Sequence, residues 1–101
     1  ILMAMNIGPG DAVITSPYTF FATAGCISRV GAEPVFVDIR PDTMHMDVDR
    51  LRDFLESECR RDVNGLLITP AGNRVRLVIP IHLFGSVCAM DELMDLCKTC
   101  E

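Results

Sequence analysis

The stretch from Gly10 to Ile39 decides the fold, and it reads GDAVITSPYTFFATAGCISRVGAEPVFVDI. Its pattern predicts a short buried strand over 12–15, a turn rich in aromatic residues, an amphipathic helix and a second buried strand over 34–39. The turn begins where the first strand ends. In open α/β sheets, ligands bind in the crevice outside the carboxyl ends of the strands. This stretch therefore bears on function as well as on fold.

The helix inside this stretch is predicted to begin at Thr19, whose hydroxyl can act as an N-cap. Gly31 follows it as a residue that can end a helix in the left-handed conformation. The apolar side of the helix is expected to bury four residues: Phe20, Phe21, Ala24 and Ile27.

Further helices and strands are predicted on either side of this stretch. Residues 1–7 are typical of the last turns of a helix, stopped by Gly8. A helix over 48–58 is expected to start at the N-cap Asp47 and to bury Val48, Leu51 and Leu55. A last helix is expected over 90–100, with the apolar stripe Met90, Leu93, Met94 and Cys97.

Two more strands are predicted over 65–69 and 75–81. The short link over 70–73 cannot hold a crossover helix, so the pair is expected to form an antiparallel hairpin. Residues 77–81 are apolar throughout, as in a strand that is covered on both faces. Strands that alternate with helices predict an α/β fold, and 101 residues suffice for one domain.

Composition excludes several classes of protein. The net charge is -5 and no basic stripe is present, so we expect no nucleic-acid partner. No apolar run approaches the roughly 20 residues of a membrane span, and no signal peptide is recognisable. The five cysteines follow no framework spacing, which favours reduced thiols and a cytoplasmic protein. Cys97 and Cys100 are interpreted as thiols on a helix face, and no metal site is predicted.

Three polar residues could line a site at the strand ends. His82 follows a buried strand, and we favour a structural hydrogen bond for it over a role in a pocket. His45 lies among polar turn residues and is expected to be solvated. Asp38 could bind a ribose only beside a glycine-rich turn, which is missing, so we expect it to accept hydrogen bonds in the next turn.

Several segments together resemble the DegT/StrS family of pyridoxal-phosphate-dependent sugar aminotransferases, which have the aspartate-aminotransferase fold. The segments are Gly10–Thr15, Thr19–Thr23, Gly31–Ile39, Ile79–Gly85 and Met90–Asp91, in the family's order. The resemblance implies that the chain is part of one cofactor-binding domain, 1–101, truncated at both ends. It also implies that Phe20 stacks on the pyridine ring of the cofactor and that Phe21 belongs to the core.

The resemblance implies a reaction as well: an amino group passes from a donor such as glutamate, through pyridoxal phosphate, to a nucleotide-linked keto-sugar. The intact protein would be a homodimer. The family's lysine, which forms a Schiff base with the cofactor, has no counterpart here, because the one lysine is Lys98 in the last helix. No catalytic residue is therefore assigned, and the 101 residues alone are expected to be inactive.

Two alternatives stay open at this point. The chain could belong to another fold-type-I pyridoxal-phosphate enzyme that acts on amino-acid substrates, or to a non-catalytic regulatory relative. Ser86 stands where the family commonly has a polar amide, which leaves the substrate contacts of this segment open.

Overall fold

A five-stranded mixed sheet with helices on both faces forms the fold. The computed structural model describes residues 1–100. The strands lie in the order β2-β1-β5-β4-β3. Strands β2, β1 and β5 are parallel, whereas β4 pairs antiparallel with both of its neighbours, β5 and β3. Their bounds are β1 Asp11–Thr15, β2 Glu33–Phe36, β3 Arg60–Arg61, β4 Leu67–Ile68 and β5 Arg74–Ile79. The predicted α/β class and the antiparallel pairing of β4 with β5 are confirmed.

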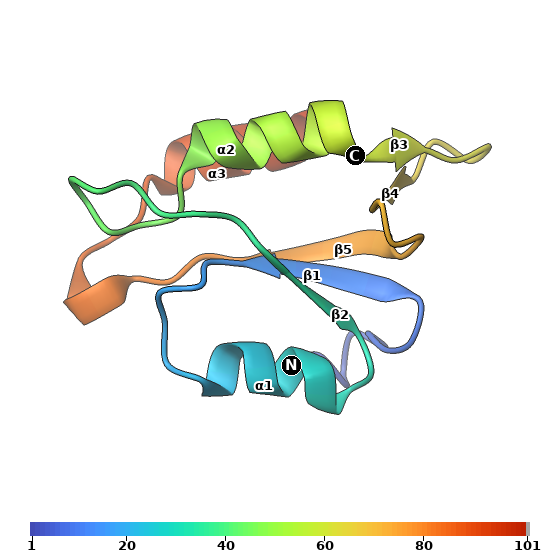
Figure 1. Ribbon diagram of the computed structural model, residues 1–101, viewed down its shortest axis with the longest axis horizontal. Helices are drawn as coiled ribbons and strands as arrows, with labels where there is room; N and C mark the ends of the chain where they lie inside the picture. The colour runs from blue at the N-terminus through green and yellow to red at the C-terminus, as the bar shows by residue number, and fades with distance from the viewer. Residues whose placement is uncertain (101) are drawn as a thin grey trace.

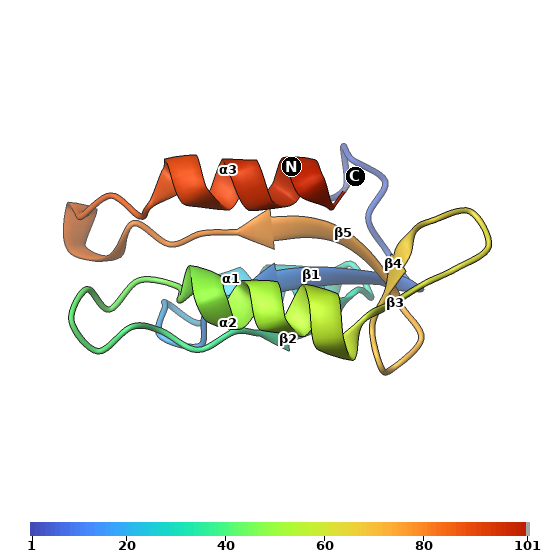
Figure 2. The ribbon, with the colours of Figure 1, turned by 90° about the horizontal axis from the view of Figure 1, so that it is seen from above.

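The helices form two layers around the sheet. Helix α1 (Ala22–Arg29) covers one face, and α2 (Val48–Asp53) and α3 (Met90–Thr99) cover the other (Figures 1 and 2). Two shorter helical segments complete the chain, the π-helix η1 (Phe54–Glu58) and the 3-10 helix η2 (Leu83–Gly85). No helix within residues 1–100 is both long and apolar enough to span a membrane.

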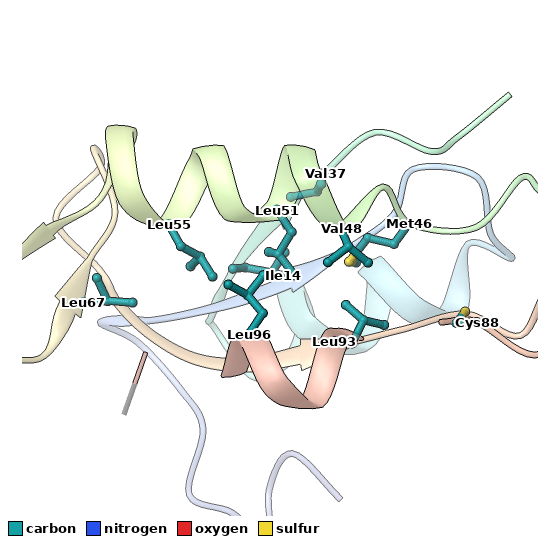
Figure 3. Close-up of a cluster of buried hydrophobic side chains, with 10 residues drawn as sticks. All are labelled: Ile14, Val37, Met46, Val48, Leu51, Leu55, Leu67, Cys88, Leu93 and Leu96. Carbon is teal, nitrogen blue, oxygen red and sulfur yellow. The ribbon is translucent and has the colours of Figure 1, made fainter. Parts of the chain in front are cut away.

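Strand β1 is the centre of the molecule, since all five of its residues are buried. Successive side chains of a strand point to opposite faces, so β1 contributes to two separate cores. Val13 packs with Ile27 and Ala32 on the α1 face. Ile14 packs on the other face against Leu51 and other side chains of the α2–α3 layer (Figure 3). The apolar run of 12–14 reflects this burial on both sides.

The helix predicted over 48–58 is confirmed as α2 followed by η1. Asp47 is its N-cap, because its Oδ1 accepts hydrogen bonds from the backbone N–H groups of Asp49 (3.0 Å) and Arg50 (3.3 Å). The expected apolar stripe of Val48, Leu51 and Leu55 is buried. The last turn widens into a π-helix, a feature that the periodicity did not predict.

The two strands that flank β1 are less buried than predicted. β2 is the edge strand beyond β1, and it ends at Phe36, whose side chain is 51% exposed. The prediction of a buried strand to residue 39 was wrong, because the chain leaves the sheet after Val37 N–H donates to the Thr15 carbonyl. β5 is half-buried along its length. It is not covered on both faces by the described residues.

The apolar stripe predicted for α3 is confirmed at Leu93 and at Met90, which packs against the core, but not at Met94. Leu93 and Leu96 are buried, whereas Met94 is 50% exposed. The residue pattern of the helix allows either of two sides to face the core, and the contact of α3 with α2 decides which side does. Leu96 therefore joins Leu51 and Leu55 in the core (Figure 3).

A short turn at the N-terminus also ends differently from the prediction. Asn6, and not Gly8, adopts the left-handed conformation, with a φ of 53°. Asn6 N–H donates to Met3 O (3.1 Å) and Ile7 N–H to Leu2 O (3.0 Å), the two bonds of a Schellman motif. Gly8 instead donates its N–H to Asp11 Oδ2 (3.1 Å), which ties this turn to β1.

Gly31, between α1 and β2, confirms the predicted left-handed helix end, with a φ of +81°. A Cβ at this position would lie 3.0 Å from Pro9 Cγ. Gly31→Ala is therefore expected to lower the free energy of unfolding by about 2 kcal/mol, from the strained backbone and the contact with Pro9. Urea unfolding followed by circular dichroism measures the change.

Gly10→Ala is the matched control for this substitution. Gly10 has a φ of +90°, but its added Cβ would meet nothing within 4 Å. Its cost is expected to be about 1 kcal/mol, from the backbone alone. Equal losses in the two variants would show that Pro9 yields freely to a methyl group at Gly31.

Candidate functional site

The carboxyl ends of β1 and β5 define the topological switch point of the sheet. The two strands are parallel neighbours, and the Thr15 hydroxyl donates a hydrogen bond to Ile79 O (3.0 Å) across their ends. The chain leaves β1 toward α1 on one face and leaves β5 toward α3 on the other (Figures 1 and 2). Ligands of open α/β sheets bind outside the strand ends at such a point. The loops 16–21 and 80–89 are therefore the candidate site.

The loop after β1 presents aromatic side chains outward. Phe20 and Phe21 are each 82% exposed, so the expectation that α1 buries them was wrong. Thr19 does not cap α1, because its hydroxyl shares a hydrogen bond with that of Thr23 (3.2 Å) and the N-cap position is Phe21. The helix thus starts later than predicted, and both rings fall outside its inward face. Ile27 is its one fully buried residue.

The two phenylalanine rings differ in what they touch. A Cβ at Gly25 would lie 3.2 Å from Phe21 Cε1, so the Phe21 ring lies against the surface that Gly25 leaves open on α1. Phe21 is therefore not the core residue that the family resemblance implied. Phe20, with the same exposure, belongs to neither of the two cores.

The loop after β5 is held by a compact set of hydrogen bonds. The Cys88 N–H donates to His82 Nδ1 (3.1 Å), and the Cys88 thiol donates to the Ile81 carbonyl (2.9 Å). Nδ1 of His82 is therefore an acceptor, which confirms the structural hydrogen bond expected for this residue. Burial raises the pKa of the Cys88 thiol and so favours the protonated donor.

Sequence reasoning missed one residue of this loop. Phe84 has a left-handed backbone (φ 54°, ψ 26°) and a side chain that is 91% exposed. Only the following Gly85, with a φ of +78°, hinted at an unusual turn in the sequence. Nothing in the hydrophobic pattern separates Phe84 from a core residue.

The other polar residues singled out in the sequence lie beside β2. Asp38 Oδ1 accepts a hydrogen bond from the Ile39 N–H (2.8 Å), as expected. His45 is only 7% exposed, so the prediction that it is solvated was wrong. Its loop folds back through the bond from Arg40 N–H to His45 O and the bridge between Ile39 and Met46. Within the described residues its Nε2 has no hydrogen-bond partner.

The Cys59 thiol and the lysine belong to neither loop of the candidate site. Residues 1–100 contain no group of three or more His, Cys, Asp or Glu side chains that could hold a metal ion. Burial raises the pKa of the Cys59 thiol to about 11. Lys98 is 67% exposed and pairs with Asp95 (3.5 Å). The last turn of α3 lies at the opposite end of the sheet from the β1–α1 loop (Figures 1 and 2).

Comparison with known proteins gives the family. All 101 residues match the model of the DegT/DnrJ/EryC1/StrS aminotransferase family. The chain is 37% identical to a pleiotropic regulatory protein of Geobacillus stearothermophilus and 36% identical to the GDP-perosamine synthase of Caulobacter vibrioides. Each alignment covers 96% of this chain and 22% of the relative. The chain thus spans about a fifth of the length of these relatives.

Solved structures agree with this match. A DegT/DnrJ/EryC1/StrS aminotransferase from Brucella abortus superposes with a TM-score of 0.81 at 33% identity, over 97% of this chain and 24% of that one. NtdA from Bacillus subtilis, solved with bound cofactor PMP, gives a TM-score of 0.75 at 28% identity, over 97% and 19% of the two chains.

The sheet and its flanking helices match those of the pyridoxal-phosphate-dependent aminotransferases. Within that class, this chain belongs to the DegT/DnrJ/EryC1/StrS aminotransferase family.

Proposed function

We propose that this chain forms part of the cofactor-binding domain of a sugar aminotransferase, which moves an amino group from an amino acid such as glutamate to a nucleotide-linked keto-sugar. The observation that carries the proposal is the exposed Phe20 ring beside the switch point of the sheet. The family supplies the reaction type, and the relatives include an enzyme named for a nucleotide-linked sugar. By resemblance to the family, the intact protein is proposed to be a cytoplasmic homodimer.

The residues present fit a flat aromatic cofactor. The Phe20 ring is 82% exposed at the loop where α/β sheets bind ligands, and no core contact explains its position. When bound, pyridoxal phosphate supplies an electron sink for the carbon that carries the amino group. Phe20 would hold the pyridine ring by stacking on one face and exclude water from that face.

The amine that holds the cofactor covalently is proposed to come from outside these 101 residues. Lys98 is the one lysine of the sequence, and it is paired with Asp95 at the far end of α3. It has neither the position nor the buried surroundings that activate a lysine amine. The 101 residues alone are therefore proposed to be inactive.

Phe20→Leu in the whole protein that contains these residues tests the proposal. The variant is expected to bind pyridoxal phosphate about fivefold more weakly, because it loses an aromatic stack worth roughly 1 kcal/mol. Titration of the apoprotein with pyridoxal phosphate, followed by absorbance, measures the change. Phe20→Tyr retains the ring and is expected to bind nearly as well as the wild type.

Phe21→Leu is the matched control, because Phe21 is the adjacent ring with the same exposure. It lies against α1 at Gly25 and is expected to leave cofactor affinity unchanged. A wild-type protein that binds no pyridoxal phosphate would overturn the proposed function. Equal losses in Phe20→Leu and Phe21→Leu would overturn the specific role of Phe20.

A regulatory protein without catalysis is the second candidate, and one observation favours it: the relative at 37% identity is named a pleiotropic regulatory protein. The two candidates differ in a direct assay. Transfer of the amino group from glutamate to a nucleotide-linked keto-sugar by the whole protein supports the enzyme, whereas cofactor binding without transfer supports the regulator.

A further inference from the structure

Phe84 is held in a conformation that its own chemistry disfavours. Its φ of 54° lies in the left-handed region, which suits glycine or asparagine and is unfavourable for a bulky aromatic residue. Its side chain is 91% exposed, so no buried contact compensates for the strain. Strained residues of this kind persist when the surrounding structure holds them, and they gather at ligand sites.

The surrounding loop does hold Phe84 in place. Gly85 N–H donates to His82 O (3.1 Å), and Ser86 N–H donates to Leu83 O (3.0 Å). Cys88 follows this turn, and its two hydrogen bonds reach back to His82 Nδ1 and Ile81 O before the turn, so they close the loop. The result is a rigid turn that presents one aromatic ring to solvent.

The position of the turn relates Phe84 to the proposed cofactor site. It follows β5, the parallel neighbour of β1, and the loop after β1 presents Phe20. The two rings therefore rise from adjacent strands at the same edge of the sheet, one on each side of the switch point. Both are exposed, and neither takes part in a core.

We propose that Phe84 is a specificity-determining residue that contacts a flat face of the nucleotide-linked sugar, either the base or the sugar ring. This inference rests on the proposed function. The segment 82–89 reads HLFGSVCA and carries no Asp, Glu, Lys or Arg, so it offers a ring face and no ion pair to a ligand. Bases stack on aromatic side chains with little dependence on sequence, through their π-faces.

Substitutions at Phe84 separate strain from binding. Phe84→Gly removes the ring and relieves the left-handed strain, so it is expected to raise the melting temperature of the whole protein. The same variant is expected to bind the ligand about tenfold more weakly, since a base–aromatic stack contributes roughly 1–3 kcal/mol. Phe84→Tyr retains the ring and is expected to keep both properties near those of the wild type.

Isothermal titration calorimetry measures binding with four probes: UDP, GDP, UDP-N-acetylglucosamine and GDP-mannose. Weaker binding of a free diphosphate by Phe84→Gly assigns the ring to the base. A loss seen only with the sugar conjugates assigns it to the sugar ring. Val63→Ala, at the exposed tip between β3 and β4, is the control and is expected to change neither binding nor melting.

Two outcomes would overturn the inference: binding of all four probes by Phe84→Gly with wild-type affinity, or no binding of any probe by the wild type. Neither readout depends on the cofactor or on amino transfer. Failure of the proposed function, seen as a wild type that binds no pyridoxal phosphate, is therefore distinguishable from failure of the role of Phe84.

Discussion

Leu96→Ala is expected to lower the free energy of unfolding by about 3 kcal/mol, the typical cost of truncating a buried leucine. Leu96 is 5% exposed on α3 and packs in the core with Leu51 and Leu55 (Figure 3). The loss combines the transfer of the removed methyl groups with the cavity left behind, because helices on both sides of the sheet limit how far this layer can collapse. Urea unfolding of the purified protein measures it.

Met94→Ala is the matched control, since Met94 lies on the same helix two residues earlier and is 50% exposed. Its substitution is expected to change the free energy of unfolding by less than about 0.5 kcal/mol. The hydrophobic pattern alone assigned the buried position to Met94 and not to Leu96. A larger loss for Met94→Ala than for Leu96→Ala would restore that assignment and contradict the packing of α3.

Asp11→Ala is expected to cost about 2–3 kcal/mol, because Asp11 is a nearly buried carboxylate with several partners. Its Oδ2 accepts the N–H of Gly8 (3.1 Å), and its Oδ1 lies 3.3 Å from Arg74 Nη2 and 3.6 Å from Arg76 Nη1. Removing the carboxylate takes its acceptor oxygens away from these donors and breaks the side-chain bond that joins Gly8 to β1. Chemical unfolding at neutral pH measures the loss.

Asp42→Ala is the control for this second substitution. The Arg40–Asp42 pair is close, at 2.9 Å, but both side chains are about half exposed. Exposed ion pairs of this kind contribute little, so the change is expected to be below about 0.5 kcal/mol. Added salt should reduce the small Asp42 effect further. Comparable losses in the two variants would mean that burial does not strengthen the Asp11 interactions.

Local chemistry explains what the sequence predicted correctly. Asp47 caps α2 because its side chain reaches N–H groups only two and three residues away. The link of five residues between β4 and β5 forces an antiparallel pair because it cannot hold a crossover. Gly31 adopts its positive φ because no other residue type does so at so little cost.

Longer-range packing explains what the sequence did not predict. His45 is buried because its loop folds back through the bridge between Ile39 and Met46. Phe21 is exposed because α1 begins only after it, and the face of α1 that packs inward is the one that carries Ile27. Periodicity counts apolar positions along a helix, but it does not say which side meets another element.

The candidate site also combines features that the sequence predicted with features that depend on tertiary packing. Its place at the end of the first strand, and the aromatic residues there, follow from the stretch 10–39, and the family resemblance singles out Phe20 within it. The partner loop with Phe84 depends on the pairing of β1 with β5, whose register joins residues more than sixty positions apart.

By itself, the sequence determined the alternation of strands and helices, the cap at Asp47, the turn at Gly31 and the family, because each depends on residues near one another in the chain or on their order. Only the tertiary structure decided which faces are buried, which of two adjacent phenylalanines lies on a helix surface and which strained ring stands beside the site. The physical reason is that burial depends on contacts between distant segments, which local pattern does not contain.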